Sequence, residues 1–114
     1  MSIFNRVAGT EESKIPVWSL MVDFTRVLDN DLSLADFTTK YNLSTAEQAE
    51  ANQYFAAIGS MIQAEVQARM NIGFPQDLAI RDARTSIDAV LRYALLRCEH
   101  GTITEAAFRT SLGL

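Results

Sequence analysis

Apolar side chains recur every three or four residues along most of this chain, which is the spacing of one face of an α-helix. After Pro16 this spacing is followed by Val17, Leu20, Met21, Phe24 and Leu28. The same pattern predicts five helices, over about residues 16–29, 33–41, 45–70 and 76–99, and a last short one that starts at Thr102 or Thr104 and ends near residue 112. We therefore expect an all-α protein, a small helical bundle with two long helices and three shorter ones.

Residues that favour helix starts and stops stand at the predicted boundaries. Ser44 and Glu47 have the spacing of a capping box, and Ser33 and Asp36 have the same spacing with a shorter acid. The segment Asn71-Ile72-Gly73-Phe74-Pro75 combines a glycine with a following proline, and it predicts the clearest break in the chain.

Residues 1–14 show no continuous helical repeat, and we expect them to form an extended N-terminal arm. The apolar side chains of this arm, Ile3, Phe4 and Val7, are candidates for contacts with a partner. The remaining residues, 15–114, are predicted to form a single helical domain.

The helix predicted over residues 16–29 is apolar around most of its circumference, because Trp18, Val22 and Val27 lie beside its main apolar stripe. The two long helices also carry apolar residues on more than one face, and a domain of 114 residues has little volume in which to bury them. Large exposed apolar patches usually mark interfaces. We therefore expect Trp18, Met21 and Val22 to contact other chains.

Residues 28–43 and 99–114 share a pattern at an offset of 71 residues, with Phe37 aligned to Phe108. Each copy has the end of a long helix, a turn and a short capped helix. This echo predicts two similar helical hairpins packed as a pseudo-symmetric pair. The alternative is that short capped helices use the same few residue types, so that such a similarity arises by chance.

Composition and charge disfavour several classes of function. The chain has 10 basic and 14 acidic residues and a net charge of −4, so it lacks the positive surface that binds a polyanion, and nucleic acid is not expected as its main partner. Its apolar runs are too short to span a membrane. Its first six residues lack the pattern of a secretory signal, so we expect synthesis in a cytoplasm.

The sequence offers no recognisable catalytic or metal-binding motif. Cys98 and His100 are the only residues of their kinds, and two residues apart on a helix their side chains point in different directions. Asp29-Asn30-Asp31 begins like a calcium loop, but Leu34 stands where that loop needs glycine and Lys40 where it needs glutamate. We therefore expect a protein that is not an enzyme and has no cofactor, metal or small-molecule substrate.

Two other functions are alternatives. The helices predicted over residues 33–41 and 45–70 are joined by a short turn, as in the helix-turn-helix of small DNA-binding regulators. The corresponding recognition segment, residues 45–53, carries two carboxylates and neither lysine nor arginine. The other alternative is an adaptor or chaperone that binds a partner helix in a groove beside the helix over residues 45–70.

Both ends of the chain resemble small structural proteins of tailed bacteriophages. The start, MSIFNRVAGTEESKIPV, has a short arm with a phenylalanine, a Gly-Thr pair and then Lys-Ile-Pro-Val entering a helix. The end, GTITEAAFRTSLGL, has a Thr-x-x-x-Phe helix that finishes in Leu-Gly-Leu. Trp18 stands where the family has histidine, which favours packing over a ligand role at that position.

The resemblance implies a virion component that is present in multiple copies and docks on its neighbours through ordered ends. It does not distinguish head, neck and tail. Together with the apolar helices, it predicts a non-enzymatic assembly protein that forms homo-oligomers and contacts other virion proteins.

Overall fold

The computed structural model of the chain describes residues 2–10 and 13–114, and all regular secondary structure in these residues is helical. The helices found there are α1 (Ile3–Ala8), α2 (Val17–Leu28), α3 (Leu34–Tyr41), α4 (Thr45–Asn71), α5 (Gln76–Glu99) and α6 (Glu105–Ser111). The all-α fold class is therefore confirmed. The described part of the chain has one helix more than the five expected, because α1 forms within the N-terminal segment.

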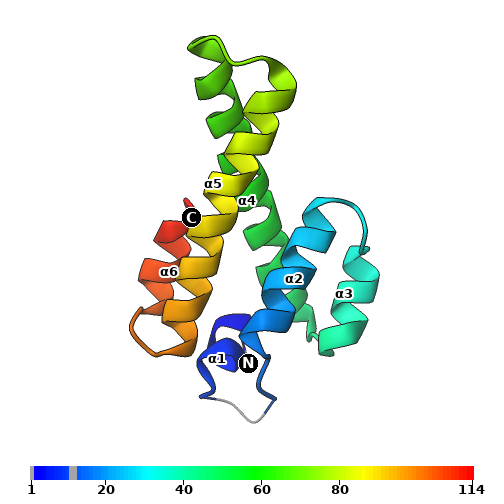
Figure 1. Ribbon diagram of the computed structural model, residues 1–114. Helices are drawn as coiled ribbons and strands as arrows, with labels where there is room; N and C mark the ends of the chain where they lie inside the picture. The colour runs from blue at the N-terminus through cyan, green and yellow to red at the C-terminus, as the bar shows by residue number, and fades with distance from the viewer. Residues whose placement is uncertain (1, 11–12) are drawn as a thin grey trace.

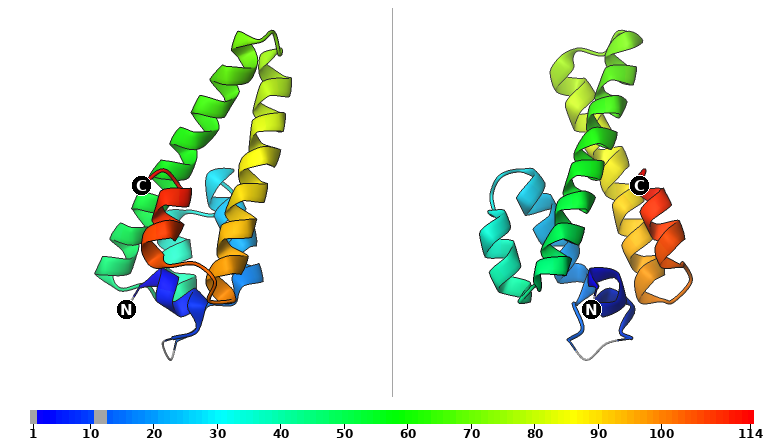
Figure 2. Two further views of the ribbon diagram at one scale, coloured as in Figure 1. Left: turned by 90° about the vertical axis from the view of Figure 1, so that its left-hand side faces the viewer. Right: turned by 180° about the vertical axis from the view of Figure 1, so that it is seen from behind.

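The long helices α4 and α5 form an antiparallel hairpin that runs the length of the molecule (Figure 1). The four shorter helices surround one half of this hairpin, and the other half projects away from them (Figure 2). The molecule is correspondingly elongated, with principal dimensions of 48 × 30 × 21 Å. None of the helices in the described ranges is long and apolar enough to cross a membrane.

Local sequence explains where these helices begin and end. The Ser44 side chain accepts a hydrogen bond from the Glu47 backbone N–H at 3.2 Å, and the Glu47 carboxylate accepts one from the Ser44 N–H at 3.0 Å. This capping box satisfies two amides at the start of α4. Helix α3 ends at Asn42, whose φ of 50° is left-handed, a conformation that asparagine tolerates better than most residues.

Aromatic rings from three helices form one centre of the core. Phe24 on α2 lies 5.9 Å from Phe37 on α3 and 4.9 Å from Phe55 on α4, measured between ring centroids. The rings are tilted, as aromatic pairs prefer. This cluster holds α2 and α3 against the half of α4 that lies within the body of the molecule.

The expectation of an extended arm is wrong for residues 3–8, which form α1. The Ser2 side chain caps this helix by accepting a hydrogen bond from the Asn5 N–H at 3.0 Å, and Gly9 ends it with a φ of 76°. Ile3, Phe4 and Val7 have helical spacing, but a repeat of six residues is too short to identify a helix from sequence, which explains the error. The arm prediction for residues 1, 11 and 12 lies outside the described residues.

The predicted echo can be compared with two pairs of helices. Helix α3 packs on α2, and α6 packs on α5, so that a short helix follows and contacts a longer one in both halves of the chain. A pseudo-symmetric relation between the two pairs stays a prediction.

Candidate protein interaction surface

Four of the six predicted contact residues lie in the core of the chain, three of them on α1. Ile3, Phe4 and Val7 are buried on α1, and the Phe4 ring lies 5.5 Å from that of Phe108 on α6. The backbone amides of Ile3 and Phe4 donate hydrogen bonds to the Glu50 carboxylate at 2.7 and 3.3 Å. These side chains therefore stabilise the fold of the chain itself and are not available as a free surface.

The predicted contacts on α2 divide between surface and core. Trp18 and Val22 are 63% and 60% exposed, and one turn of helix separates them, so they lie on the same face. Met21 lies beside this face, toward the core, and is buried. We call Trp18 and Val22 the α2 face.

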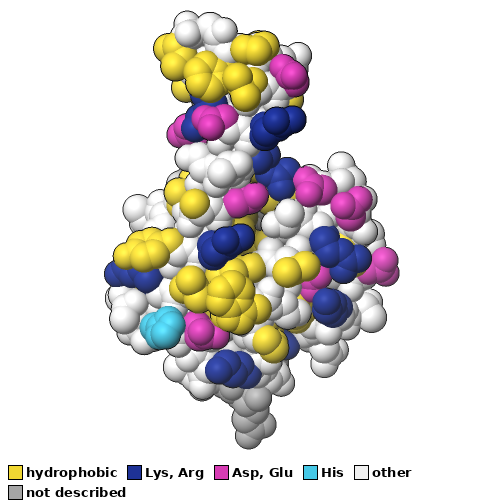
Figure 3. Space-filling view, viewed as in Figure 1, with side chains coloured by type: hydrophobic (Ala, Val, Ile, Leu, Met, Phe, Trp, Pro, Cys, Tyr) yellow, Lys and Arg dark blue, Asp and Glu magenta, His cyan; other side chains and the backbone are white. Residues whose placement is uncertain are grey.

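The projecting end of the α4–α5 hairpin, residues 59–83, is the most weakly packed part of the structure and is called the hairpin tip below. Its only buried residues are Ala79 and Ala83, so no large side chain is buried between its helices. The exposed large apolar side chains of the tip are Met70, Ile72, Leu78 and Ile80. Figure 3 shows apolar side chains gathered over this end of the molecule.

An apolar groove runs between the two helices of the hairpin tip. Its volume is about 470 Å³, and its lining residues are Ile62, Gln63, Val66, Gln67, Met70, Gln76 and Ile80. No residue of this lining carries a charge. An apolar groove between helices is a common site for a partner helix. The sequence predicted a groove beside the helix over residues 45–70 only as an alternative, without placing it at the tip, and binding of a partner helix there stays a prediction.

Charged side chains of the hairpin tip pair with one another outside this groove. Arg69 on α4 contacts Glu65 at 2.6 Å and Asp82 on α5 at 2.5 Å. The hydrogen bonds that the Arg69 guanidinium donates to Asp82 and Glu65 raise its pKa above the ordinary value. The Arg69–Asp82 pair joins α5 to α4, and the Arg69–Glu65 pair lies within α4. Both add little stability, because water screens them.

A buried ion pair anchors α1 to the start of α4. The Arg6 guanidinium lies 3.2 Å from the Glu47 carboxylate, and it also donates hydrogen bonds to the backbone carbonyls of Ser13 and Tyr41. Burial works against ionisation of Glu47, but hydrogen bonds from Ser44 and Arg6 outweigh it and lower the pKa of this carboxyl. This ionised pair holds α1 against α4, and neither residue lines the groove of the hairpin tip or the pocket at the C-terminal residues.

A second buried carboxylate, Asp23, joins α2 to α3. It accepts a hydrogen bond from the Tyr41 hydroxyl at 2.5 Å, and Lys40 lies 2.7 Å from it. Burial opposes ionisation of Asp23, yet its bonds to Lys40, Tyr41 and Arg26 keep its pKa below the usual value. Burial and the Asp23 bond raise the pKa of Tyr41 far above its ordinary value, so its hydroxyl stays a donor.

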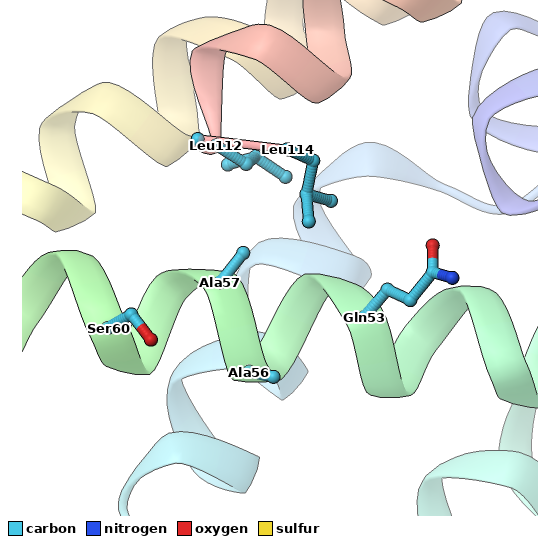
Figure 4. A pocket seen from close by; sticks show the side chains of 7 residues that line it. Gln53, Ala56, Ala57, Ser60, Leu112 and Leu114 are labelled. Atoms are coloured by element: carbon cyan, nitrogen blue, oxygen red, sulfur yellow. The ribbon is translucent and has the colours of Figure 1, made fainter.

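The C-terminal residues form another shallow pocket, of about 400 Å³, against α4. Figure 4 shows Leu112 and Leu114 facing Ala57 across it, with Gln53 and Ser60 farther along α4. The α4 side of the pocket consists of two alanines, Ser60 and Gln53, and no charged side chain lines it. No histidine, cysteine or carboxylate side chain accompanies the Ser60 hydroxyl in this lining.

The only cysteine and histidine do not form a reactive pair. Cys98 is buried, its thiol donates to the Phe4 carbonyl at 3.3 Å, and burial raises its pKa to about 12. His100 is exposed and lies 4.0 Å from Glu99. Among residues 2–10 and 13–114, no group of three or more histidine, cysteine, aspartate or glutamate side chains is placed to hold a metal ion.

Both acids of the possible DNA-recognition segment, residues 45–53, contact other parts of the protein. Glu47 is buried against Arg6, and Glu50 accepts hydrogen bonds from α1 and from the Tyr54 hydroxyl. This segment is therefore the N-terminal anchor of α4 in the body of the molecule. DNA recognition stays an untested prediction.

A comparison with known protein families, curated proteins and solved structures finds no significant match to this chain. The surfaces described above, the hairpin tip and the α2 face, are thus the features from which a function can be inferred.

Proposed function

We propose that this chain is a non-enzymatic assembly protein that binds other protein chains through apolar helix surfaces. The observation that carries the proposal is the hairpin tip, where residues 59–83 bury only two alanines and expose Met70, Ile72, Leu78 and Ile80. A contact that removes apolar surface from water gains about 25 cal/mol for each Å² buried. A partner that covers the tip would therefore stabilise both the complex and the hairpin.

The α2 face supplies a second, separate surface. Trp18 and Val22 belong to a helix that packs in the body of the molecule, whereas the tip projects from it (Figure 1). Tryptophan is enriched among residues that dominate binding energy. A chain with two apolar surfaces on different elements can contact two neighbours at once, as a repeated subunit of an assembly must.

We further propose that the assembly is a bacteriophage particle, in which the chain is present in several copies and contacts other virion proteins. The support is the resemblance carried by the two ends of the chain, MSIFNRVAGTEESKIPV and GTITEAAFRTSLGL. In the structure these ends are neighbours, since Phe4 from the first packs on Phe108 from the second. The resemblance thus concerns two segments that support each other.

The decisive experiment follows the chain into particles. The chain is tagged in the genome that encodes it, particles are purified on a density gradient, and its copies per particle are counted by quantitative mass spectrometry. We expect a fixed copy number greater than one. Recovery of the chain only as free protein would contradict the virion proposal.

Variants of the α2 face test whether that surface is used in assembly. Trp18→Ala combined with Val22→Ser should reduce incorporation into particles, because it removes exposed apolar area while leaving the buried face of α2 intact. Tyr93→Ala is the matched control, since Tyr93 is an equally exposed aromatic residue on α5. Equal incorporation of both variants would remove the α2 face from the proposal.

A second candidate, an adaptor that binds a partner helix, is favoured by the groove beside α4. The groove of about 470 Å³ lies between two helices and is lined by Ile62, Val66, Met70 and Ile80 with three glutamines. A helix with apolar residues at three- and four-residue spacing would fit such a groove. Cross-linking of the intact chain in the infected cell distinguishes the two, because an adaptor would cross-link to a partner that particles lack.

A further inference from the structure

The groove of the hairpin tip has no charged side chain in its lining. Its lining combines apolar side chains, among them Val66 and Ile80, with the amides of Gln63, Gln67 and Gln76. Burying a charged group without a partner is the most costly part of covering a polar surface. A partner that covers this groove does not incur that cost, because the lining has no charged side chain. The occupant that fits it is therefore uncharged where it touches the groove.

The amides make this surface complementary to itself. Each glutamine side chain has both a hydrogen-bond donor and an acceptor, so two such chains can pair in either sense. A two-fold interface brings the same patch of both subunits together, and like charges would repel there. A patch of apolar groups and amides meets this condition.

The projection of the tip gives a second copy room to approach. The shorter helices surround the opposite half of the hairpin, and the views in Figure 2 show no other helix beside the tip. The two helices of one tip and the two of another would complete a four-helix arrangement, the usual way in which helical pairs acquire a common core. Ile62, Val66 and Ile80 would then become core residues.

We propose that the groove of the hairpin tip is occupied by the tip of a second copy of this chain, in a two-fold dimer; this inference rests on the proposed assembly function. The tip is about 20 Å long and two helices wide, so its face covers roughly 400 Å², about half of the standard 800 Å² per partner. An interface of this size is smaller than that of most stable complexes, so we expect the free dimer to be weak.

Sedimentation equilibrium on the intact chain between about 10 µM and 1 mM measures this association. The wild-type chain is expected to change from monomer to dimer over that range. Ile80→Glu places like charges in the two-fold interface and should raise the dissociation constant at least tenfold. A wild-type chain that stays monomeric at the highest concentration would overturn the inference.

Val90→Glu is the matched control for Ile80→Glu. Both residues are on α5 and both are partly exposed, at 39% and 44%, but Val90 lies outside the tip. The control should dimerise as the wild type does. Gln76→Glu provides a second charged variant at an exposed residue of the groove and should also weaken the dimer. If Val22→Glu abolishes the dimer while Ile80→Glu does not, copies associate through the α2 face and the inference is wrong.

Amide hydrogen exchange at low and high concentration adds a local readout. Exchange in residues 59–83 should slow as the dimer forms, and exchange in α2 should stay unchanged. The outcomes also separate this inference from the proposed function. A monomeric chain that is found in particles overturns only the self-association, and a dimeric chain that is absent from particles overturns only the virion role.

Discussion

The rings of Phe4 and Phe108 lie 5.5 Å apart at a tilt of 58°, so the first and last helices of the chain pack directly on each other. Phe108 also contacts Tyr54 edge-on at 5.5 Å, which places it between α1 and α4. The two ends are therefore parts of one core, and substitutions at either end should affect the stability of the whole molecule.

Phe108→Ala is expected to lower the free energy of unfolding by about 3–5 kcal/mol, because it removes a buried ring and leaves a cavity between three helices. Urea denaturation followed by circular dichroism measures this change. Tyr93→Ala removes an exposed ring that only stacks on Arg97, and it should cost less than about 1 kcal/mol. Similar losses for the two variants would contradict the packing of α6 on α1.

Arg6→Met is expected to destabilise the fold by about 3–5 kcal/mol, because it leaves the Glu47 carboxylate buried without its partner. The double variant Arg6→Met with Glu47→Gln should recover part of that loss, since the remaining group is neutral. The control is Arg84→Ala, which breaks the more exposed pair with Asp29 and should cost about 1 kcal/mol or less. Thermal denaturation of the four proteins decides between these expectations.

Stability should fall as the solution is acidified below about pH 4. The folded-state pKa values of Asp23 and Glu47 are lowered, so the stability that each provides is present above its unfolded value, near 4, and is lost as the pH falls through its folded value. The measurement is the urea midpoint between pH 7 and pH 2. Asp23→Asn should show a smaller loss over the acid range than the wild type, and an identical loss would argue against an ionised Asp23.

The Cys98 thiol should react slowly with a thiol reagent in the folded protein and quickly in urea, because it is buried and its pKa is raised to about 12. An exposed cysteine introduced by Ser86→Cys into a Cys98→Ala background provides the reference rate. If Cys98 reacted at that rate under native conditions, the packing of α1 over the thiol would be wrong.

Much of the fold follows from residues near one another in sequence. Capping at Ser33 and Ser44 and the break before Pro75 predicted the boundaries of α3, α4 and α5 to within about a residue. Helix α1 was missed because its order depends on distant groups. The Glu50 carboxylate accepts hydrogen bonds from the first amides of α1, and Phe108 covers the apolar face of this helix. The sequence near α1 gives no indication of either contact.

The candidate surface was predicted only in part for the same reason. The wide apolar face of α2 indicated that the core could not cover all of its apolar side chains. Trp18 and Val22 are exposed, whereas Met21 faces the core. The hairpin tip looks like any other helical repeat in sequence. Its exposure results from where the shorter helices pack, since they cover the other half of α4 and α5 (Figure 2). Such long-range packing cannot be inferred from periodicity alone.

The contacts of α1 also set an order of events during synthesis. Six residues are too few for a stable isolated helix, and α1 needs Glu50 and then Phe108 to complete its surroundings. Helix α1 is therefore synthesised well before the residues that complete its surroundings. The apolar side chains of α1 lack this partner until the segment that contains Phe108 has left the ribosome.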